Sequence, residues 1–129
     1  RAPELVRPRV WLARVGSADE ARHHLLHAQK IAPDDALVAS ELGRLELAAG
    51  RPAEALVHFG RALALSPNHA QAIANRGVAF LLLGQRDAAR ADFEQALRLD
   101  PCSAEARHNL REIGIKVESA PDNCAPVQK

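Results

Sequence analysis

Three histidines close together are the residues of this sequence with the most evident potential for chemistry. His23 and His27 are four positions apart, so on a helix they would share one face and could bind a metal ion together with Glu20. His24, however, occupies the place of the catalytic glutamate in a zinc protease. Because the surrounding residues predict no pocket, we interpret the histidines as a solvated cluster, with weak adventitious metal binding as the alternative.

Other catalytic arrangements are missing from the sequence. Gly16, Gly50 and Gly84 form no phosphate-binding loop, because they are spaced at regular intervals along the chain. No combination of Ser, His and Asp indicates a nucleophile, and the carboxylates are spread evenly. We therefore predict a protein that is not an enzyme, with no catalytic residue, no cofactor and no metal.

The two cysteines, Cys102 and Cys124, have a spacing typical neither of a metal site nor of a redox motif. A bridge between them would require the C-terminal segment to fold back. We expect two unpaired thiols.

Composition and charge narrow the class of protein further. The net charge is +1, and basic and acidic groups are balanced along the chain, whereas a nucleic-acid-binding protein would present a basic stripe. No apolar run approaches the roughly 18 residues of a membrane span. The start is not a signal peptide, and the chain contains no Met, so Arg1 is not expected to be the natural start. We expect a cytoplasmic protein that binds neither nucleic acid nor membranes.

The elements that would position any site recur with one fixed period. Pro33, Pro67 and Pro101 are separated by equal steps. The glycines named above follow the same step, as do three further series: Ala21, Ala55 and Ala89; Leu25, Phe59 and Phe93; Ala28, Ala62 and Ala96. Such a period indicates an array of repeated supersecondary units.

Apolar residues recur with helical spacing, and no segment alternates as a strand would, so we predict an all-α protein. Proline, glycine and capping residues set the limits of the helices. Asp34 and Asp35 start one helix, Asn68 starts another, and Ser103 caps the last. The expected helices span about 8–15, 17–31, 34–49, 52–65, 68–83, 86–99 and 104–115, followed by a flexible C-terminal tail over 117–129.

These residues resemble the tetratricopeptide repeat family, in which each unit of about 34 residues is a helical hairpin with a Leu-Gly pair, small residues, an aromatic and a closing Pro. The matching residues are Leu42, Gly43, Ala55, Phe59, Ala62 and Pro67, then Gly77, Phe80, Ala89, Phe93, Ala96 and Pro101. Arg76 replaces the Leu of the second pair. Ala39 and Glu46 stand where the family often has large aromatics, so the helix that carries them is expected to be rotated or to pack through Leu45 and Leu47.

The resemblance implies an α-solenoid with a right-handed superhelix, built from three hairpins and a capping helix. The expected repeats cover about 2–35, 36–69 and 70–103, the first one irregular, and the capping helix covers 104–115, within a domain of residues 1–116. Arg107, Arg111 and Glu112 are expected to give the cap a solvated outer face.

The resemblance also implies that the first helices of successive hairpins line a concave groove that binds an extended peptide. That groove is expected to present Arg7, Val10, Arg14, Ser40, Glu41, Arg44, Leu47, Asn75, Val78, Leu81, Leu82, His108, Asn109 and Glu112. Asn75 and Asn109 are one period apart and resemble the asparagine ladder of some peptide-binding members, with two ordinary surface amides as the alternative.

The charges of the groove predict which ligands fit. The resemblance would allow a clamp for the carboxylate of chaperone tails, but Glu105 stands where that clamp needs a cation, so we predict no such recognition. Arg7, Arg14, Arg44 and Arg76 favour a ligand that is acidic near the first repeat.

Our leading interpretation is thus a non-catalytic scaffold or adaptor that binds a peptide or a helix of another protein. Two alternatives stay open: a regulatory or targeting domain excised from a larger enzyme or assembly factor, and a structural module that self-associates weakly, with Trp11 among the contacts.

Overall fold

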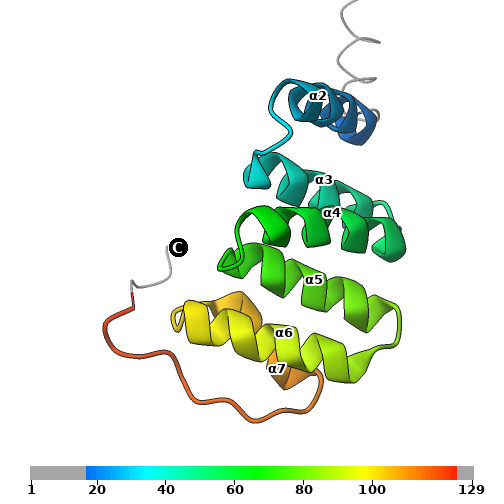
Figure 1. The fold of residues 1–129 in the computed structure, drawn as a ribbon. Coiled ribbons are helices and arrows are strands. Elements are labelled where there is room, and N and C mark those ends of the chain that lie inside the picture. Colours follow the sequence, from blue (N-terminus) through cyan, green and yellow to red (C-terminus); the bar gives the residue numbers. More distant parts are fainter. Residues whose placement is uncertain (1–16, 125–129) are drawn as a thin grey trace, which may run out of the picture.

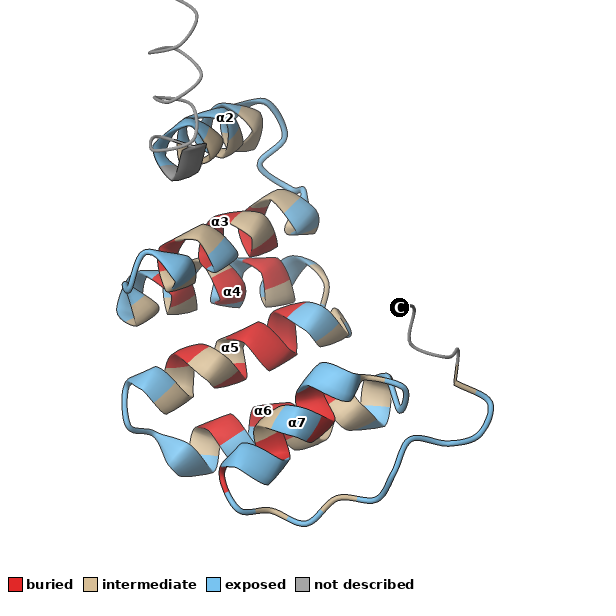
Figure 2. Ribbon diagram, turned by 180° about the vertical axis from the view of Figure 1, so that it is seen from behind, coloured by how far each residue is buried: buried red, intermediate tan, exposed pale blue. Residues whose placement is uncertain are grey.

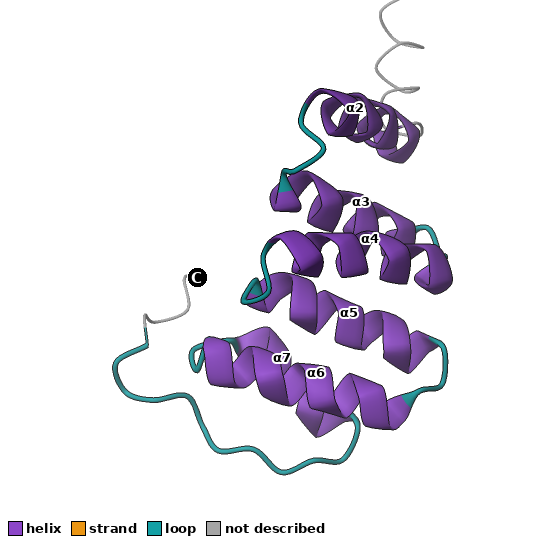
Figure 3. Ribbon diagram, in the orientation of Figure 1, coloured by secondary structure: helices purple, strands orange, loops and turns teal. Residues whose placement is uncertain are grey.

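The chain folds into a stack of helices (Figure 1). The computed structural model describes residues 17–124, and all regular structure in that range is helical (Figure 3). The helices are α2 (Ser17–Ile31), α3 (Ala36–Ala48), α4 (Pro52–Leu65), α5 (Ala70–Leu82), α6 (Arg86–Leu99) and α7 (Ala104–Glu112). The helix expected over 8–15 lies outside the described residues. None of the described helices is long and apolar enough to cross a membrane.

The helices pack in hairpins, and the stack of hairpins is curved. Helix α3 pairs with α4, and α5 pairs with α6, while α4 packs on α5 and α6 packs on α7. The backbone of α5 also contacts α3 and α7, whereas α4 makes no such contact with α2 or α6. The layer formed by α3, α5 and α7 is therefore the tighter one, which makes it the concave side of the stack.

Each helix of the concave layer begins with a side chain that caps it at the same place in the repeat. Asp35, His69 and Ser103 follow one another at the repeat period and accept hydrogen bonds from the backbone N–H groups of Leu37, Ala72 and Ala106, at 3.0, 3.3 and 3.1 Å. These bonds satisfy amides that have no partner inside the helix. The expectation that Asn68 starts α5 was wrong, because His69 takes the capping position.

Glycines in the left-handed conformation end the same three helices. Gly50, Gly84 and Gly114 have φ values of 78°, 80° and 85°, which residues with a Cβ rarely adopt. The residue after each glycine donates a backbone hydrogen bond into the last turn, from Arg51 to Glu46, from Gln85 to Phe80 and from Ile115 to Leu110. Gly114 follows Gly84 by less than one full period, so α7 ends at Glu112 and not at Ile115 as expected.

Two pairs of a glycine and a phenylalanine hold the hairpins together. An added Cβ on Gly43 would lie 2.5 Å from the ring of Phe59, and one on Gly77 would lie 2.6 Å from the ring of Phe93. Both phenylalanines are fully buried. The rings therefore fill the space that the glycines leave open, and α3 and α5 can approach their partner helices closely. Figure 2 shows buried residues in each of the helices α3 to α7.

The segment after α7 folds back and is covalently fixed. Ile115 and Val117 pack against the buried cluster of Phe93, Leu110 and Ile113. Cys124 forms a disulfide with Cys102, which lies in the turn between α6 and α7. The expectation of two unpaired thiols was therefore wrong, because the chain after α7 returns to that turn. Residues 117–124 of the expected tail are tethered at their end.

Arg107 is buried as well, contrary to the expectation of a solvated position on the cap. Its guanidinium donates to the backbone carbonyls of Pro101 and Ser103. Arg107 thereby joins α7 to the turn that precedes it, while Arg111 and Glu112 are exposed as expected.

Candidate functional site: the concave groove

A shallow depression of about 390 Å³ lies on the concave side, where α3, α5 and the start of α7 meet. Its floor and walls are mostly aliphatic, with single polar groups between them. The lining residues are Arg44, Leu47, Ala48, Gln71, Asn75, Val78, Leu82 and Glu105. Arg44, Leu47, Asn75, Val78 and Leu82 were expected in the groove, so five of the predicted positions lie together in the structure.

Asn75 is the most unusual residue of the depression. It is only 8% exposed, and its Nδ2 atom is buried without a hydrogen-bond partner among the described residues. A buried amide donor without a partner costs roughly 1–3 kcal/mol. Rotation of the terminal amide exchanges donor and acceptor, so this side chain can offer either one to a group that enters the depression.

Other predicted groove residues have different environments. Ser40 is buried, with 2% of its surface exposed, and is not presented to a ligand. Leu81 packs against the cluster around Phe93 and does not line the depression. Glu41 lies beside the depression and pairs with Arg44 at 3.6 Å.

The capping helix carries the predicted residues His108, Asn109 and Glu112. All three lie on α7 outside the lining of the depression, with His108 and Glu112 exposed and Asn109 half-buried. The predicted residues Arg7, Val10 and Arg14 lie outside the described part of the chain.

Arg76 does not contribute a free positive charge to the groove. Its Nε and Nη2 atoms donate to the two carboxylate oxygens of Asp92, both at 2.8 Å. This hydrogen bonding raises the pKa of the Arg76 guanidinium above its usual value, against the opposing effect of partial burial. Arg76 therefore joins α5 to α6. Of the arginines expected to make the groove basic, Arg44 lines the depression, with Glu41 as its partner at 3.6 Å.

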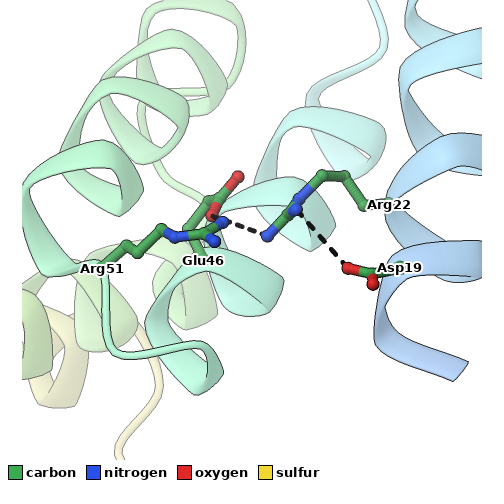
Figure 4. A network of polar contacts seen from close by, with 4 residues as sticks. All are labelled: Asp19, Arg22, Glu46 and Arg51. Atoms are coloured by element: carbon green, nitrogen blue, oxygen red, sulfur yellow. Dashed lines mark hydrogen bonds and ion pairs between the residues drawn. The ribbon is translucent and has the colours of Figure 1, made fainter. Parts of the chain in front are cut away.

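A second charged network joins α2 to the hairpin formed by α3 and α4 (Figure 4). The Oε1 atom of Glu46 accepts hydrogen bonds from Arg22 and from Arg51, each at 3.1 Å, and Asp19 lies 3.7 Å from Arg22. Glu46 is 8% exposed and Ala39 is fully buried. Leu47 packs against the cluster of Ala55, Phe59 and Ala79, which agrees with the expected alternative that α3 packs through this residue. Arginine side chains from α2 and from the hairpin turn satisfy the buried carboxylate.

Sequence reasoning missed three residues of the depression: Ala48, Gln71 and Glu105. Gln71 could have been found, because it lies one helical turn before Asn75 on the same face of α5. Glu105 was considered only as an obstacle to a carboxylate ligand. Its presence beside α5 depends on the packing of α7, which the spacing of residues alone does not determine.

His23, His24 and His27 are exposed on α2, where His23 and His27 line a separate shallow hollow with Lys30. The rings of His23 and His24 are 6.2 Å apart. Within residues 17–124, no group of three or more potential ligands is arranged to hold a metal ion.

Comparison with known proteins agrees with the geometry of the fold. The family model described as tetratricopeptide repeat matches residues 34–101. No curated protein matches the sequence.

Solved structures resemble the chain over most of its length. The first repeat domain of Spaghetti (RPAP3), bound to the HSP90 peptide SRMEEVD, is 25% identical, with 88% of this chain and 90% of that chain covered and a TM-score of 0.74. The second repeat domain of human RPAP3, in complex with the HSP70 peptide SGPTIEEVD, is 26% identical over 81% of this chain and 88% of that chain, with a TM-score of 0.72. YrrB, a repeat protein with an unusual peptide-binding site, shares the fold at 24% identity and a TM-score of 0.70, over 78% of this chain and 52% of its own.

The family model covers more than half of the sequence, and its limits coincide with the two hairpins that contain the glycine and phenylalanine pairs. The chain therefore belongs to the tetratricopeptide repeat family.

Proposed function

We propose that this protein is a non-catalytic interaction module that binds an extended segment of a partner protein in its concave groove. The observation that carries the proposal is Asn75, a buried amide without an internal partner among the described residues, in the wall of an aliphatic depression. An extended peptide brings a backbone N–H or C=O group that satisfies this amide, and its side chains can cover Leu47, Val78 and Leu82.

The similar structures support this class of function. Two of them are complexes with short peptides, and both are at least 25% identical to this chain. Peptide binding of this kind requires no catalytic group, which is consistent with a non-catalytic interaction module.

We further propose that the ligand differs from the peptides in those complexes, which end in EEVD. Glu105 lines the groove and would repel an acidic chain end there. Arg44 lines the groove on the side of α3, and because its pair with Glu41 is exposed and weak, it favours an acidic group of the ligand on that side.

Selection of peptides provides the experiment. A random-sequence peptide library displayed on phage is selected on the protein, and the affinities of the recovered peptides are measured by fluorescence polarisation. Asn75→Ala should weaken binding about tenfold, as expected for the loss of one buried hydrogen bond. Asn68→Ala, which changes an exposed asparagine in the turn before α5, is the matched control and should leave affinity unchanged.

Two results would contradict the proposal. One is the failure to recover any peptide. The other is recovery of peptides that bind the Asn75→Ala variant as tightly as the unchanged protein, because binding would then occur elsewhere.

The disulfide bears on the compartment in which this function takes place. The sequence led us to expect the cytoplasm, where disulfides are rare, but the Cys102–Cys124 bond supports an oxidising compartment instead. Alkylation of the protein from its native source, followed by mass measurement, distinguishes the two. Two alkylated cysteines before reduction would restore the cytoplasmic assignment.

A further inference from the structure

A second hollow, of about 190 Å³, adjoins the groove at the turn between α6 and α7. Its walls come from the first turns of α5 and α7 and from the end of α6. Gln71 and Glu105 line both the depression and this hollow, so the two form one continuous surface.

The hollow is negatively charged. Asp100 and Glu105 both line it, and no basic side chain of the described residues does. Neither carboxylate forms an ion pair within residues 17–124. Asp100 uses Oδ1 to accept a hydrogen bond from the backbone N–H of Cys102 at 3.2 Å, which fixes the orientation of its carboxylate beside the hollow.

A second observation concerns the depression that adjoins these carboxylates. The amide of Asn75 lacks a partner in the described part of the chain, is more than nine-tenths buried and lines the depression that Glu105 also lines. Gln71 lies one helical turn before Asn75, in the direction of the hollow. A peptide backbone bound by Asn75 can therefore continue along α5 past Gln71 to the two carboxylates.

We propose that the hollow formed by Asp100 and Glu105 takes the cationic side chain of a Lys or Arg in the bound segment. This inference rests on the proposed function and specifies its ligand. The segment has three parts in order: an acidic group near Arg44, an aliphatic side chain over Leu47, Val78 and Leu82, and a basic residue at the turn between α6 and α7. Opposite charges at the two ends of the groove also fix the direction of the bound segment.

The experiment compares peptide selection on the unchanged protein with selection on the Asp100→Asn/Glu105→Gln variant. The Asp100→Asn change retains a side-chain oxygen that accepts from Cys102, so the turn is conserved while the charge is removed. Peptides recovered by the unchanged protein should be enriched in Lys or Arg beside an aliphatic residue. The variant should lose the basic enrichment and keep the aliphatic one.

Affinity measurements give the size of the effect. A recovered basic peptide should bind the double variant about three- to tenfold more weakly, as expected for two solvent-accessible charge pairs, and its binding should become less sensitive to salt. Glu54→Gln is the control, because it removes another carboxylate from the first turn of a helix, in α4 on the other layer of the stack. It should leave affinity unchanged.

The results separate this inference from the proposed function. Peptides that depend on Asn75 but show no preference for Lys or Arg, or whose affinity is the same for the double variant, would overturn the inference and leave the groove function intact. If no recovered peptide depends on Asn75, both fail.

Discussion

The two complete hairpins, α3 with α4 and α5 with α6, have the same framework but carry charged residues at different places. In both, a glycine on the first helix faces a buried phenylalanine on the second, and a Cβ added to either glycine would lie at nearly the same distance from the ring. The close contact between the two helices is therefore the same in both hairpins. At two positions on the first helix, one hairpin has a charged residue where the other has a large apolar residue that packs in the core.

At the first position, Leu42 of α3 corresponds to Arg76 of α5, one period later. Leu42 is fully buried, whereas Arg76 is partly exposed and forms its two hydrogen bonds to Asp92. The residue that corresponds to Asp92 in the earlier hairpin is His58. The ion pair of Arg76 and Asp92 in one hairpin thus stands where the other hairpin has a leucine and a histidine.

At the second position the exchange is reversed, because Glu46 of α3 corresponds to Phe80 of α5. Phe80 packs against the cluster around Phe93, and the guanidinium of Arg76 lies 5.8 Å from its ring. Glu46 instead binds Arg22 of α2 and Arg51. The charge in the second hairpin acts within the hairpin, whereas the charge in the first hairpin joins it to the preceding helix.

The comparison shows that one framework tolerates a charge at either position if a neighbouring helix supplies the opposite charge. It also indicates that the two charged groups have different roles. The following substitutions test this difference, in order of expected effect.

Arg76→Leu, which gives the second hairpin the leucine of the first, should have the largest effect. We expect the free energy of unfolding to fall by about 2–3 kcal/mol, because the nearly buried carboxylate of Asp92 loses both hydrogen bonds. Arg76→Leu/Asp92→His recreates the leucine and histidine of the first hairpin and should recover most of the loss. Urea denaturation measures both. Unchanged stability of the single variant would show that the ion pair is dispensable.

Gly43→Ala and Gly77→Ala should each destabilise the protein by about 1–3 kcal/mol, because the new methyl group overlaps a phenylalanine ring that has no free space. Gly60→Ala is the matched control, since Gly60 lies in a helix with no atom near the added Cβ. It should stabilise the protein by about 0.5–1 kcal/mol through helix propensity. Thermal denaturation of the three variants is sufficient. Different losses for Gly43 and Gly77 would end the claim of a shared framework.

Glu46→Gln should cost about 1 kcal/mol, because Arg22 and Arg51 can still donate to the side-chain oxygen but lose the negative charge with which they pair. Amide hydrogen exchange should accelerate in α2 and stay unchanged in α5 and α6. Glu41→Gln, which affects only the surface pair with Arg44, serves as the control. Faster exchange in α5 would contradict a role limited to joining α2.

His58 should give the smallest effect, a dependence of stability on pH. Burial lowers the pKa of His58 below its usual value of 6.5, with Arg61 and Arg22 acting in the same direction and Glu46 opposing them. In the unfolded chain His58 binds a proton as the pH falls through 6.5, while the folded protein resists it, so stability declines below that pH. Urea denaturation at one pH above and one pH below the usual histidine pKa measures this effect. The free energy of unfolding should decline less between the two for His58→Gln than for the unchanged protein. Equal declines would mean that His58 contributes nothing.

The sequence predicted most of the fold because its period repeats residue types with a definite packing role. It placed Pro52–Leu65 and Arg86–Leu99 at their observed limits. It failed for α5 where a preference for a residue type was followed instead of the period, since Asn68 is a better helix cap by type but His69 has the correct position. It also failed for α7, where Gly114 does not follow the period.

The candidate site was only partly predictable. The face of α5 that carries Asn75, Val78 and Leu82 follows from helical spacing and the resemblance to the family. The role of Arg76 could not be predicted, because it depends on Asp92 in the partner helix.

The sequence by itself determined the helices, their hairpins and the family, because proline, glycine and phenylalanine at a fixed period admit few other arrangements. The tertiary structure decided which charged groups neutralise one another, that Cys102 meets Cys124, and that Asp100 and Glu105 line one hollow next to the groove. These are contacts between helices and turns that the period does not relate, so only the packing of the chain brings them together.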